Sequence, residues 1–515
     1  MHNAFRGIQW STRKVLLIFI ITTFLLVFAL RVKNDGSIVK ETHYQAAQAV
    51  VNQASDFMWK IRNSILSSGT DGMFEPMNTK RFRLADGSLK SDELFVWYAF
   101  YDLRDPEGPR IRILINALCK DLKKEDVMID LGDGDPPLPL AWAEVLGTAG
   151  CPGSSGCIVQ EMELSSIVYR GKVPEKINIL RKSKSVQVKL HRLPTSYKDD
   201  INTCIVAPLY WFNDWPRLFL SLEWWRRNKS NKLLMHIHSM SPSAKKVIDY
   251  YIEQGFLEIR PFPMMPFTKE FDPNNLVYYG AEHLTTFFCS IWSDTKYTTM
   301  NDIDEMFWVR NKSDSLLNIA RRLMDPVKHP DIAALGLEAN ALAFPDGIAP
   351  KPWSFNKFRR LEFVKKAHPF HWGGLSKYIY LTQYAKLPWI HGMRMFYAGK
   401  RSESIPKEQA VMLHMRNSFL NTSQGNKVFP EYQMFEDEAL PELDSILGEI
   451  FGEELPDYKT PETMPIVVNC TVRSISEIPG QACNKPTGRV CYEAVQGIDE
   501  WLLAVPTEDS QFIVV

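Results

Sequence analysis

The sequence predicts an α/β fold, and two observations lead to that prediction. Segments that look like buried strands recur through the first half of the chain, and strands alternate with amphipathic helices in its middle. A repeated strand, helix, strand unit favours a mainly parallel sheet with helices on both faces, because each crossover returns over one face of the sheet. The chain has 515 residues, 45% of them hydrophobic, so it can bury a large core.

The first predicted strands lie between residues 93 and 131. In Glu93–Tyr101 apolar side chains occupy both alternating faces, which is typical of a central strand covered on both sides. Segments 111–118 and 126–131 are predicted to be further strands. The last of them ends in the turn 132–137, where glycine and proline flank an Asp-Gly-Asp triplet and favour a structural role for it.

The middle of the chain predicts a strand, helix, strand unit. A helix is expected to begin at Pro216, because a first-turn proline is followed there by apolar residues at helical spacing. Segment 233–238 is then a predicted strand, 241–255 a helix that ends at a glycine, and 256–262 another strand.

The N-terminus carries an uncharged, apolar segment, Val15–Leu30. As a helix it would be about 24 Å long, which is near the thickness of the thinner membranes of the secretory pathway. We expect a transmembrane signal-anchor at 15–30 after a cytoplasmic tail, 1–14, and before a stem, 31–90, and one large domain, 91–515. A cleaved signal peptide is the alternative for the same segment.

Features after residue 30 predict an oxidising, lumenal compartment and a single-pass type II topology. All eight cysteines follow the anchor, and none shows the CxxC spacing of a metal site. Four Asn-x-Ser/Thr sequons also follow it and are candidate N-glycosylation sites: Asn228, Asn311, Asn421 and Asn469. The zero formal net charge excludes a global basic surface for nucleic acid.

The sharpest local motif is Asp302-Ile303-Asp304-Glu305, directly after a predicted strand, 296–300. Carboxylates two residues apart at the end of a strand should point the same way. Such a pair suits Mn²⁺ or Mg²⁺, which is typically held by one or two carboxylates together with substrate phosphates. The alternative is a solvated acidic turn.

Several sequence blocks follow one another in order over about 320 residues: Tyr101-Asp102-Leu103-Arg104, Pro208-Leu209-Tyr210 before a helix, Ser239, Tyr250–Gly255, Cys289, Lys296, the Asp302–Glu305 run, His391, and His414-Met415-Arg416. In this order and spacing they resemble glycosyltransferase family 92. The resemblance implies a GT-A fold, a UDP-sugar donor (UDP-galactose in characterised members), a Mn²⁺-type ion, and a Golgi membrane protein that acts on glycans.

The resemblance also implies roles for individual residues. Asp302, Asp304 and Glu305 form the expected catalytic run, and Asp302, Asp304 and His414 the expected metal ligands. The expected donor-binding residues are Tyr101, Asp102, Arg104 and Arg416. Partners are then the nucleotide-sugar donor, a glycan acceptor and the membrane.

Departures from the family pattern leave a second interpretation open. Glu282, Phe287 and Phe288 stand where the family commonly has an amide and an Asn-Asp pair, and Met415 stands inside the His-x-Arg triplet. The chain could therefore be a weak or inactive member that binds glycans or a partner. Inverting transfer also needs a carboxylate base; Glu282 is one candidate, with a helix-surface charge as the alternative for it.

Overall fold

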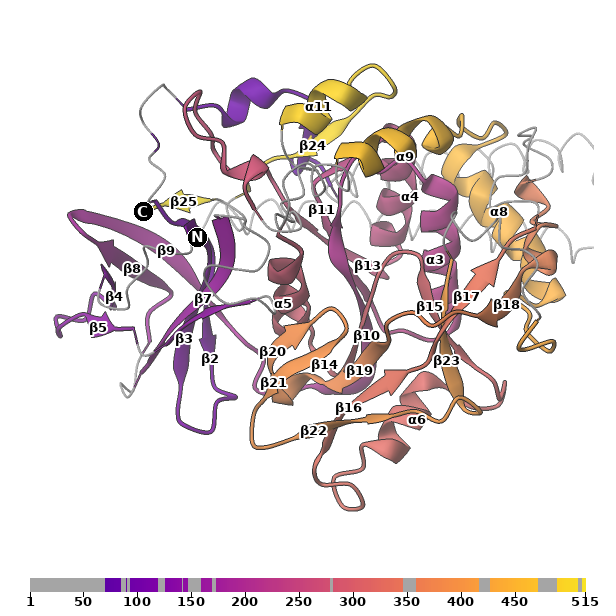
Figure 1. Ribbon diagram of the computed structural model, residues 1–515, viewed down its shortest axis with the longest axis horizontal. Helices are drawn as coiled ribbons and strands as arrows, with labels where there is room; N and C mark the ends of the chain where they lie inside the picture. The colour runs from indigo at the N-terminus through magenta and orange to yellow at the C-terminus, as the bar shows by residue number, and fades with distance from the viewer. Residues whose placement is uncertain are drawn as a thin grey trace, which may run out of the picture. The chain divides into compact units, whose positions relative to one another are not determined.

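The computed structural model (Figure 1) describes residues 70–84, 89, 93–118, 126–140, 142–146, 159–168, 173–277, 281–345, 358–415, 427–470, 489–507 and 512–515. Gly72–Val515 forms one compact unit and Met1–Asp71 another. The compact unit therefore begins inside the predicted stem. The predicted tail and the predicted anchor, 15–30, lie outside the described residues. Within the described ranges, no helix is long and apolar enough to cross a membrane.

A seven-stranded sheet organises the larger unit. Its strands, in spatial order, are β13 (Leu257–Pro261), β11 (Leu233–Ile237), β10 (Lys198–Leu209), β14 (Thr295–Asn301), β19 (Lys377–Leu381), β16 (Ile332–Leu337) and β22 (Arg401–Ser404). The first four are parallel to one another, β19 is antiparallel to both of its neighbours, and β22 is parallel to β16.

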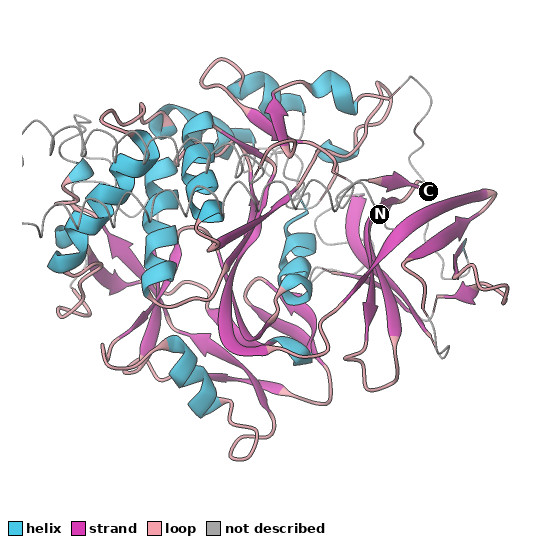
Figure 2. Cartoon of the chain, turned by 180° about the vertical axis from the view of Figure 1, so that it is seen from behind, coloured by secondary structure: helices cyan, strands magenta, loops and turns pink. Residues whose placement is uncertain are grey.

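Helices cover both faces of the parallel strands, as predicted (Figures 1 and 2). Ile205 and Met235 face a core that they share with α3 (Trp215–Arg227) and α4 (Pro242–Glu253). Cys204 and Leu234 face the opposite way, toward Cys289 of α5 (Glu282–Trp292). Asp214 and Ser241 cap α3 and α4, so the predicted helix starts are confirmed.

A second, curled sheet precedes the first along the chain. Its strands, in order, are β5 (Leu138–Pro139), β4 (Val127–Asp130), β8 (Lys176–Arg181), β9 (Lys184–Arg192), β2 (Phe95–Asp102), β3 (Arg110–Leu118), β7 (Val159–Ile167) and β6 (Trp142–Val145), with β25 (Ile513–Val514) beside β2. All neighbours are antiparallel except β2 and β9.

The expectation of a mainly parallel sheet is therefore wrong for this half of the unit. Links such as 103–109 and 182–183 are too short to carry a crossover helix, so they join antiparallel strands. The double-sided burial of β2 has another cause. Val96 and Ala99 face the core inside the curled sheet, and Trp97 and Phe100 face a core shared with α5.

A four-stranded sheet leads away from the end of β14. Its order is β15 (Glu305–Val309), β23 (Ala410–His414), β17 (Ala339–Ala343) and β18 (His368–His371). The remaining elements are β1 (Phe74–Pro76), η1 (Thr79–Phe82), β12 (Ser239–Met240), η3 (Pro273–Asn275), α6 (Leu316–Leu323), η5 (Val364–Lys366), η6 (Thr382–Tyr384), β20 (Ala385–Trp389), β21 (Gly392–Phe396), η8 (Asp437–Ala439), α8 (Leu440–Phe451), α9 (Thr460–Val468), α11 (Arg489–Val495) and β24 (Leu502–Ala504).

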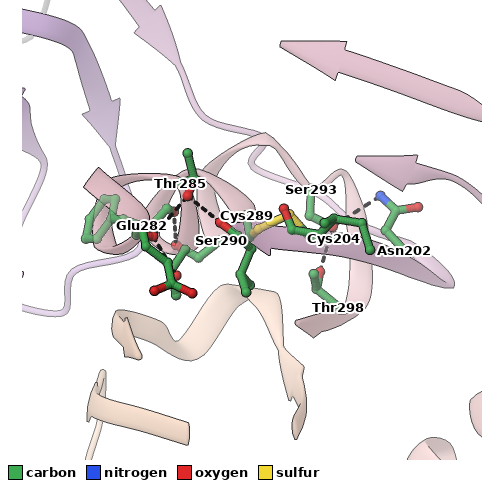
Figure 3. Close-up of a disulfide and its surroundings, with 12 residues drawn as sticks. Asn202, Cys204, Glu282, Thr285, Cys289, Ser290, Ser293 and Thr298 are labelled. Atoms are coloured by element: carbon green, nitrogen blue, oxygen red, sulfur yellow. Dashed lines mark hydrogen bonds between the residues drawn. A yellow bond between two sulfur atoms is a disulfide. The ribbon is translucent and has the colours of Figure 1, made fainter. Parts of the chain in front are cut away.

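Two disulfides join described cysteines, Cys204–Cys289 and Cys470–Cys491. The first ties α5 to β10, as Figure 3 shows. Glu282 lies at the start of the same helix, two turns and about 10 Å along its axis from Cys289. The disulfide therefore fixes the helix that presents Glu282. The other four cysteines lie outside the described residues.

Candidate active site at the carboxyl end of the parallel strands

The carboxyl ends of β10, β11 and β14 meet at one edge of the seven-stranded sheet. Ligands in open α/β sheets bind at this edge, outside the ends of the strands. At this edge β14 ends at Asn301, and β15 departs at Glu305 toward the four-stranded sheet. The Asp302–Glu305 run lies at the crossing point between two sheets.

Asp302-Ile303-Asp304 forms a tight turn, which corrects the expectation that both carboxylates point the same way from a strand. The Glu305 N–H donates to the Asp302 carbonyl (3.0 Å), and the Asp302 N–H donates to Glu305 Oε2 (2.8 Å). A turn breaks the two-residue alternation of a strand. The two aspartates consequently have different partners.

Asp302 and Glu305 share one buried cation, Lys377 at the start of β19. Its Nζ lies 3.0 Å from Asp302 Oδ2 and 3.3 Å from Glu305 Oε2. The Lys377 side chain is fully buried, so its charge requires these partners. The other oxygen of Asp302, Oδ1, is also buried and accepts no hydrogen bond from any described residue.

Asp304 contacts a histidine and an arginine instead. His414 Nε2 lies 3.2 Å from Asp304 Oδ1, and Arg217 Nη1 lies 3.4 Å from Asp304 Oδ2. His414 is placed there by the pairing of β15 with β23, which sets it opposite Glu305. The predicted metal ligands Asp304 and His414 are thus brought together.

An aromatic loop borders this cluster. The Trp372 ring lies 4.9 Å from the His414 ring, edge to face. Gly374 makes this position possible, because a Cβ there would lie 2.1 Å from the Trp372 ring. The loop then enters β19 at Lys377, so both ends of the loop are anchored in the cluster.

Glu282 also belongs to this cluster, so it is not an exposed surface charge. Burial and the negative charge of Asp302 raise the pKa of Glu282 to about 8, against the opposing charge of Lys377. Burial likewise raises the pKa of Glu305 to about 7, although Lys377 counteracts it. Five carboxyl groups thus surround two buried cations: Asp302, Glu305 and Glu282 lie around Lys377, and Asp304 and Asp214 lie around Arg217.

The predicted donor-binding residues form a separate cluster. Asp102 accepts hydrogen bonds from Arg104 (Nε and Nη2, both 2.8 Å) and from Arg112 (3.1 Å), and Arg104 also donates to the carbonyls of Ser290 and Thr382. Ser290 lies eight residues along α5 from Glu282, a helical rise of about 12 Å. Asp102 and Arg104 therefore hold the curled sheet against the far part of α5. Tyr101 lies under Arg192, whose guanidinium is 5.6 Å from its ring.

The remaining predicted residues are distributed as follows. Arg416 and Asn421 lie outside the described residues. Asn311 and Asn469 are exposed. Asn228 is half-buried at the end of α3, where its Nδ2 donates to the Trp224 carbonyl (2.8 Å).

Within the described ranges, no three His, Cys, Asp or Glu side chains are grouped as a metal-binding set. Mn²⁺ and Mg²⁺ do not require such a set, because they are typically held by one or two carboxylates plus substrate phosphates. The unpartnered Oδ1 of Asp302 and the adjacent carboxylate of Asp304 fit that requirement. The donor set at the turn is thus all oxygen, with His414 beside it.

Sequence reasoning missed Arg217 and Lys377 as members of the site. A signal for Arg217 existed, because it lies in the first turn of a predicted helix that follows β10. Lys377 gave none, since it is 75 residues from Asp302 in sequence.

Comparison with known proteins supports the family resemblance. The sequence profile of glycosyltransferase family 92 matches residues 199–447, which include β10, β14, β15 and the Asp302–Glu305 turn. No curated protein matches the chain. Among solved structures, amylomaltase from Corynebacterium glutamicum is 14% identical over 28% of this chain, with a TM-score of 0.12. That match spans about a fifth (21%) of amylomaltase and supports no argument. Over residues 199–447 the chain is therefore similar to glycosyltransferase family 92.

Proposed function

We propose that the chain is a metal-dependent glycosyltransferase that moves galactose from UDP-galactose to a glycan acceptor on glycoproteins. The observation that supports this proposal most is the crowding of Asp302, Asp304, Glu305 and Glu282 at the carboxyl edge of the parallel strands, inside the region that matches the family. Burial and crowding raise the pKa values of Glu282 and Glu305, and a bound cation would lower them again, so the cluster favours a cation.

Asp302 and Asp304 would hold Mn²⁺ or Mg²⁺, with His414 as a third ligand. When bound, such an ion neutralises charge on the leaving diphosphate. Lys377 keeps Asp302 and Glu305 in place, and the loop from Trp372 to Lys377 borders the reacting region. The Trp372 ring offers an apolar face of the kind on which sugar rings stack.

The sequence features supply the cellular setting of the proposal. The segment 15–30 would anchor the protein in the Golgi membrane, and the catalytic unit would lie in the lumen, with a GT-A fold. N-linked glycans on Asn311 and Asn469 suit their exposure.

The test is a transfer assay. Purified residues 31–515, made in a secretory host, would be incubated with a panel of UDP-sugars, Mn²⁺ and mixed glycans. Transfer of galactose that stops with EDTA and returns with Mn²⁺ is the expected result. No transfer from any UDP-sugar would overturn the enzymatic proposal, and glycan binding without turnover would favour a lectin-like member of the family.

A further inference from the structure

Arg217 is a buried arginine beside the Asp302–Glu305 turn. Its side chain is only 8% exposed. It lies in the first turn of α3, where its backbone N–H donates to the cap residue Asp214 (3.2 Å). The same aspartate lies 3.0 Å from Arg217 Nε through Oδ2, so Asp214 fixes both the helix start and the guanidinium.

The guanidinium is not saturated by these contacts. Nη1 lies 3.4 Å from Asp304, a longer separation than the 2.8 Å of the Asp102–Arg104 pair. Nη2 is buried and donates to no acceptor on any described residue, and Nε, although it lies 3.0 Å from Asp214, makes no hydrogen bond there either. A buried donor on a charged group is costly to leave unpaired. The fork therefore has room for one further acceptor that the described chain does not supply.

The position of Arg217 suits a phosphate as that acceptor. The planar fork of arginine matches the oxygens of a phosphate, and a charge-assisted contact of this kind is stronger than a neutral hydrogen bond. The first turn of a helix adds positive potential in the same place. Lys377, the other buried cation of the cluster, also contacts two carboxylates, but its single nitrogen already donates a hydrogen bond to Asp302 (3.0 Å).

We propose that Arg217 binds the diphosphate of the nucleotide-sugar donor and that Asp214 is a positioning residue that aims the guanidinium at it. This proposal rests on the proposed function. When the bond between the sugar and the diphosphate breaks, its electron pair stays on the diphosphate oxygen, and Arg217 interacts more strongly with the added charge.

The test compares the binding of UDP and of uridine by ligand-observed NMR titration, with Mn²⁺ and again with EDTA. Arg217→Met should weaken UDP about 10- to 100-fold and leave uridine unchanged, because only UDP offers phosphates. Arg217→Lys, which keeps the charge but loses the fork, should fall between Met and wild type. Asp214→Asn should weaken UDP about 3- to 10-fold while it still caps α3, since asparagine caps as well as aspartate.

Arg226→Met is the matched control. Arg226 lies on the same helix and pairs with Glu223 and Glu442 at its other end, so UDP binding should be unchanged. Circular dichroism checks folding, and if Arg217→Met does not fold, the Lys and Asp214→Asn variants decide. Equal loss of UDP and uridine, or no loss of UDP, would overturn the role of Arg217. Wild type that binds no UDP would instead overturn the proposed function and this role with it.

Discussion

Two buried clusters of charged residues flank the ends of α5, and they differ in how completely their members are paired. Around Asp102, both carboxylate oxygens accept hydrogen bonds, from Arg104 and Arg112. Around the Asp302–Glu305 turn, carboxylates outnumber cations, and polar atoms of Asp302 and Arg217 have no partner among the described residues.

The pKa values of the carboxyl groups in the two clusters are shifted in opposite directions. Burial alone would raise the pKa of Asp102, but the charges of Arg104 and Arg112 and the hydrogen bonds from Arg104 hold it well below its usual range. Burial raises the pKa values of Glu282 and Glu305, and neighbouring carboxylates add to the effect. A saturated network stabilises a fold, whereas an unsaturated one is suited to bind something. From this contrast we predict that Asp102 stabilises the fold, and its expected role in donor binding stays a prediction.

The largest effect is expected for a substitution in the incompletely paired cluster around the Asp302–Glu305 turn. Asp304→Asn should lower sugar transfer by at least about 100-fold, because it removes charge that the proposed cation needs. The free energy of unfolding should change by less than about 1 kcal/mol, since the turn is crowded with like charges. A transfer assay and urea unfolding measure the two effects.

Asp135→Asn is the control for that change. Asp133 and Asp135 repeat the spacing of the motif in an exposed turn after β4. Transfer by Asp135→Asn at the wild-type rate is expected. An equal loss of transfer in Asp304→Asn and Asp135→Asn would contradict a specific role of Asp304 at the site.

A substitution in the fully paired cluster around Asp102 should instead affect stability. Asp102→Asn leaves Arg104 and Arg112 buried with incomplete partners and should reduce the free energy of unfolding by about 3 kcal/mol. At a temperature where the variant is folded, the KM for the donor should stay within about threefold of wild type. A KM for the donor raised tenfold or more in the folded variant would instead support the predicted role of Asp102 in donor binding.

A third change sharpens the comparison within one strand. Glu161 and Glu163 are two residues apart on β7; Glu163 pairs with Arg112, while Glu161 has no partner on another described residue. Burial raises the pKa of Glu161 to about 8, so ionisation costs stability as pH rises from about 4.5 to 8. Glu161→Gln should therefore be more stable than wild type at pH 8, by on the order of 2 to 4 kcal/mol, and equal to it at pH 4.

Unfolding curves at pH 4, 6 and 8 give the result. If the difference between Glu161→Gln and wild type does not grow with pH, Glu161 is not the buried, unpaired carboxyl described above. Glu163→Gln should behave oppositely, and destabilise the protein at pH 8, because it breaks the pair with Arg112.

The smallest expected effect concerns the loop beside His414. Gly374→Ala places a methyl group where the Trp372 ring lies and should displace the ring, with a loss of about 5- to 20-fold in kcat/KM. Gly373→Ala is the control, because its Cβ would meet nothing within 4 Å. Equal activity of the two variants would remove Trp372 from the site.

The sequence predicted local features well and long-range ones poorly. The starts of α3 and α4 were predictable because proline and a capping residue mark them locally. The hairpins of the curled sheet were missed because a strand buried on both faces looks alike in parallel and antiparallel sheets. The role of Arg104 could not be predicted, since its carbonyl partners lie 186 and 278 residues away.

The same reasoning applies within the candidate site. The Asp302–Glu305 run was visible as a motif, and its family resemblance was confirmed over residues 199–447. Its turn geometry was not visible, because no glycine or proline marks the turn. Lys377 and Arg217 reach the turn only through the pairing of strands and the packing of α3, which no local pattern encodes.

The difference between the charged clusters at Asp102 and at the Asp302–Glu305 turn is tested most directly by counting bound Mn²⁺ in the presence of UDP. Electron paramagnetic resonance gives this count. If the Asp302–Glu305 turn binds the cation, wild type and Asp102→Asn should each bind one Mn²⁺ ion per chain, and Asp304→Asn should lose Mn²⁺ binding. Mn²⁺ bound as well by Asp304→Asn as by wild type, or lost in folded Asp102→Asn, would contradict it.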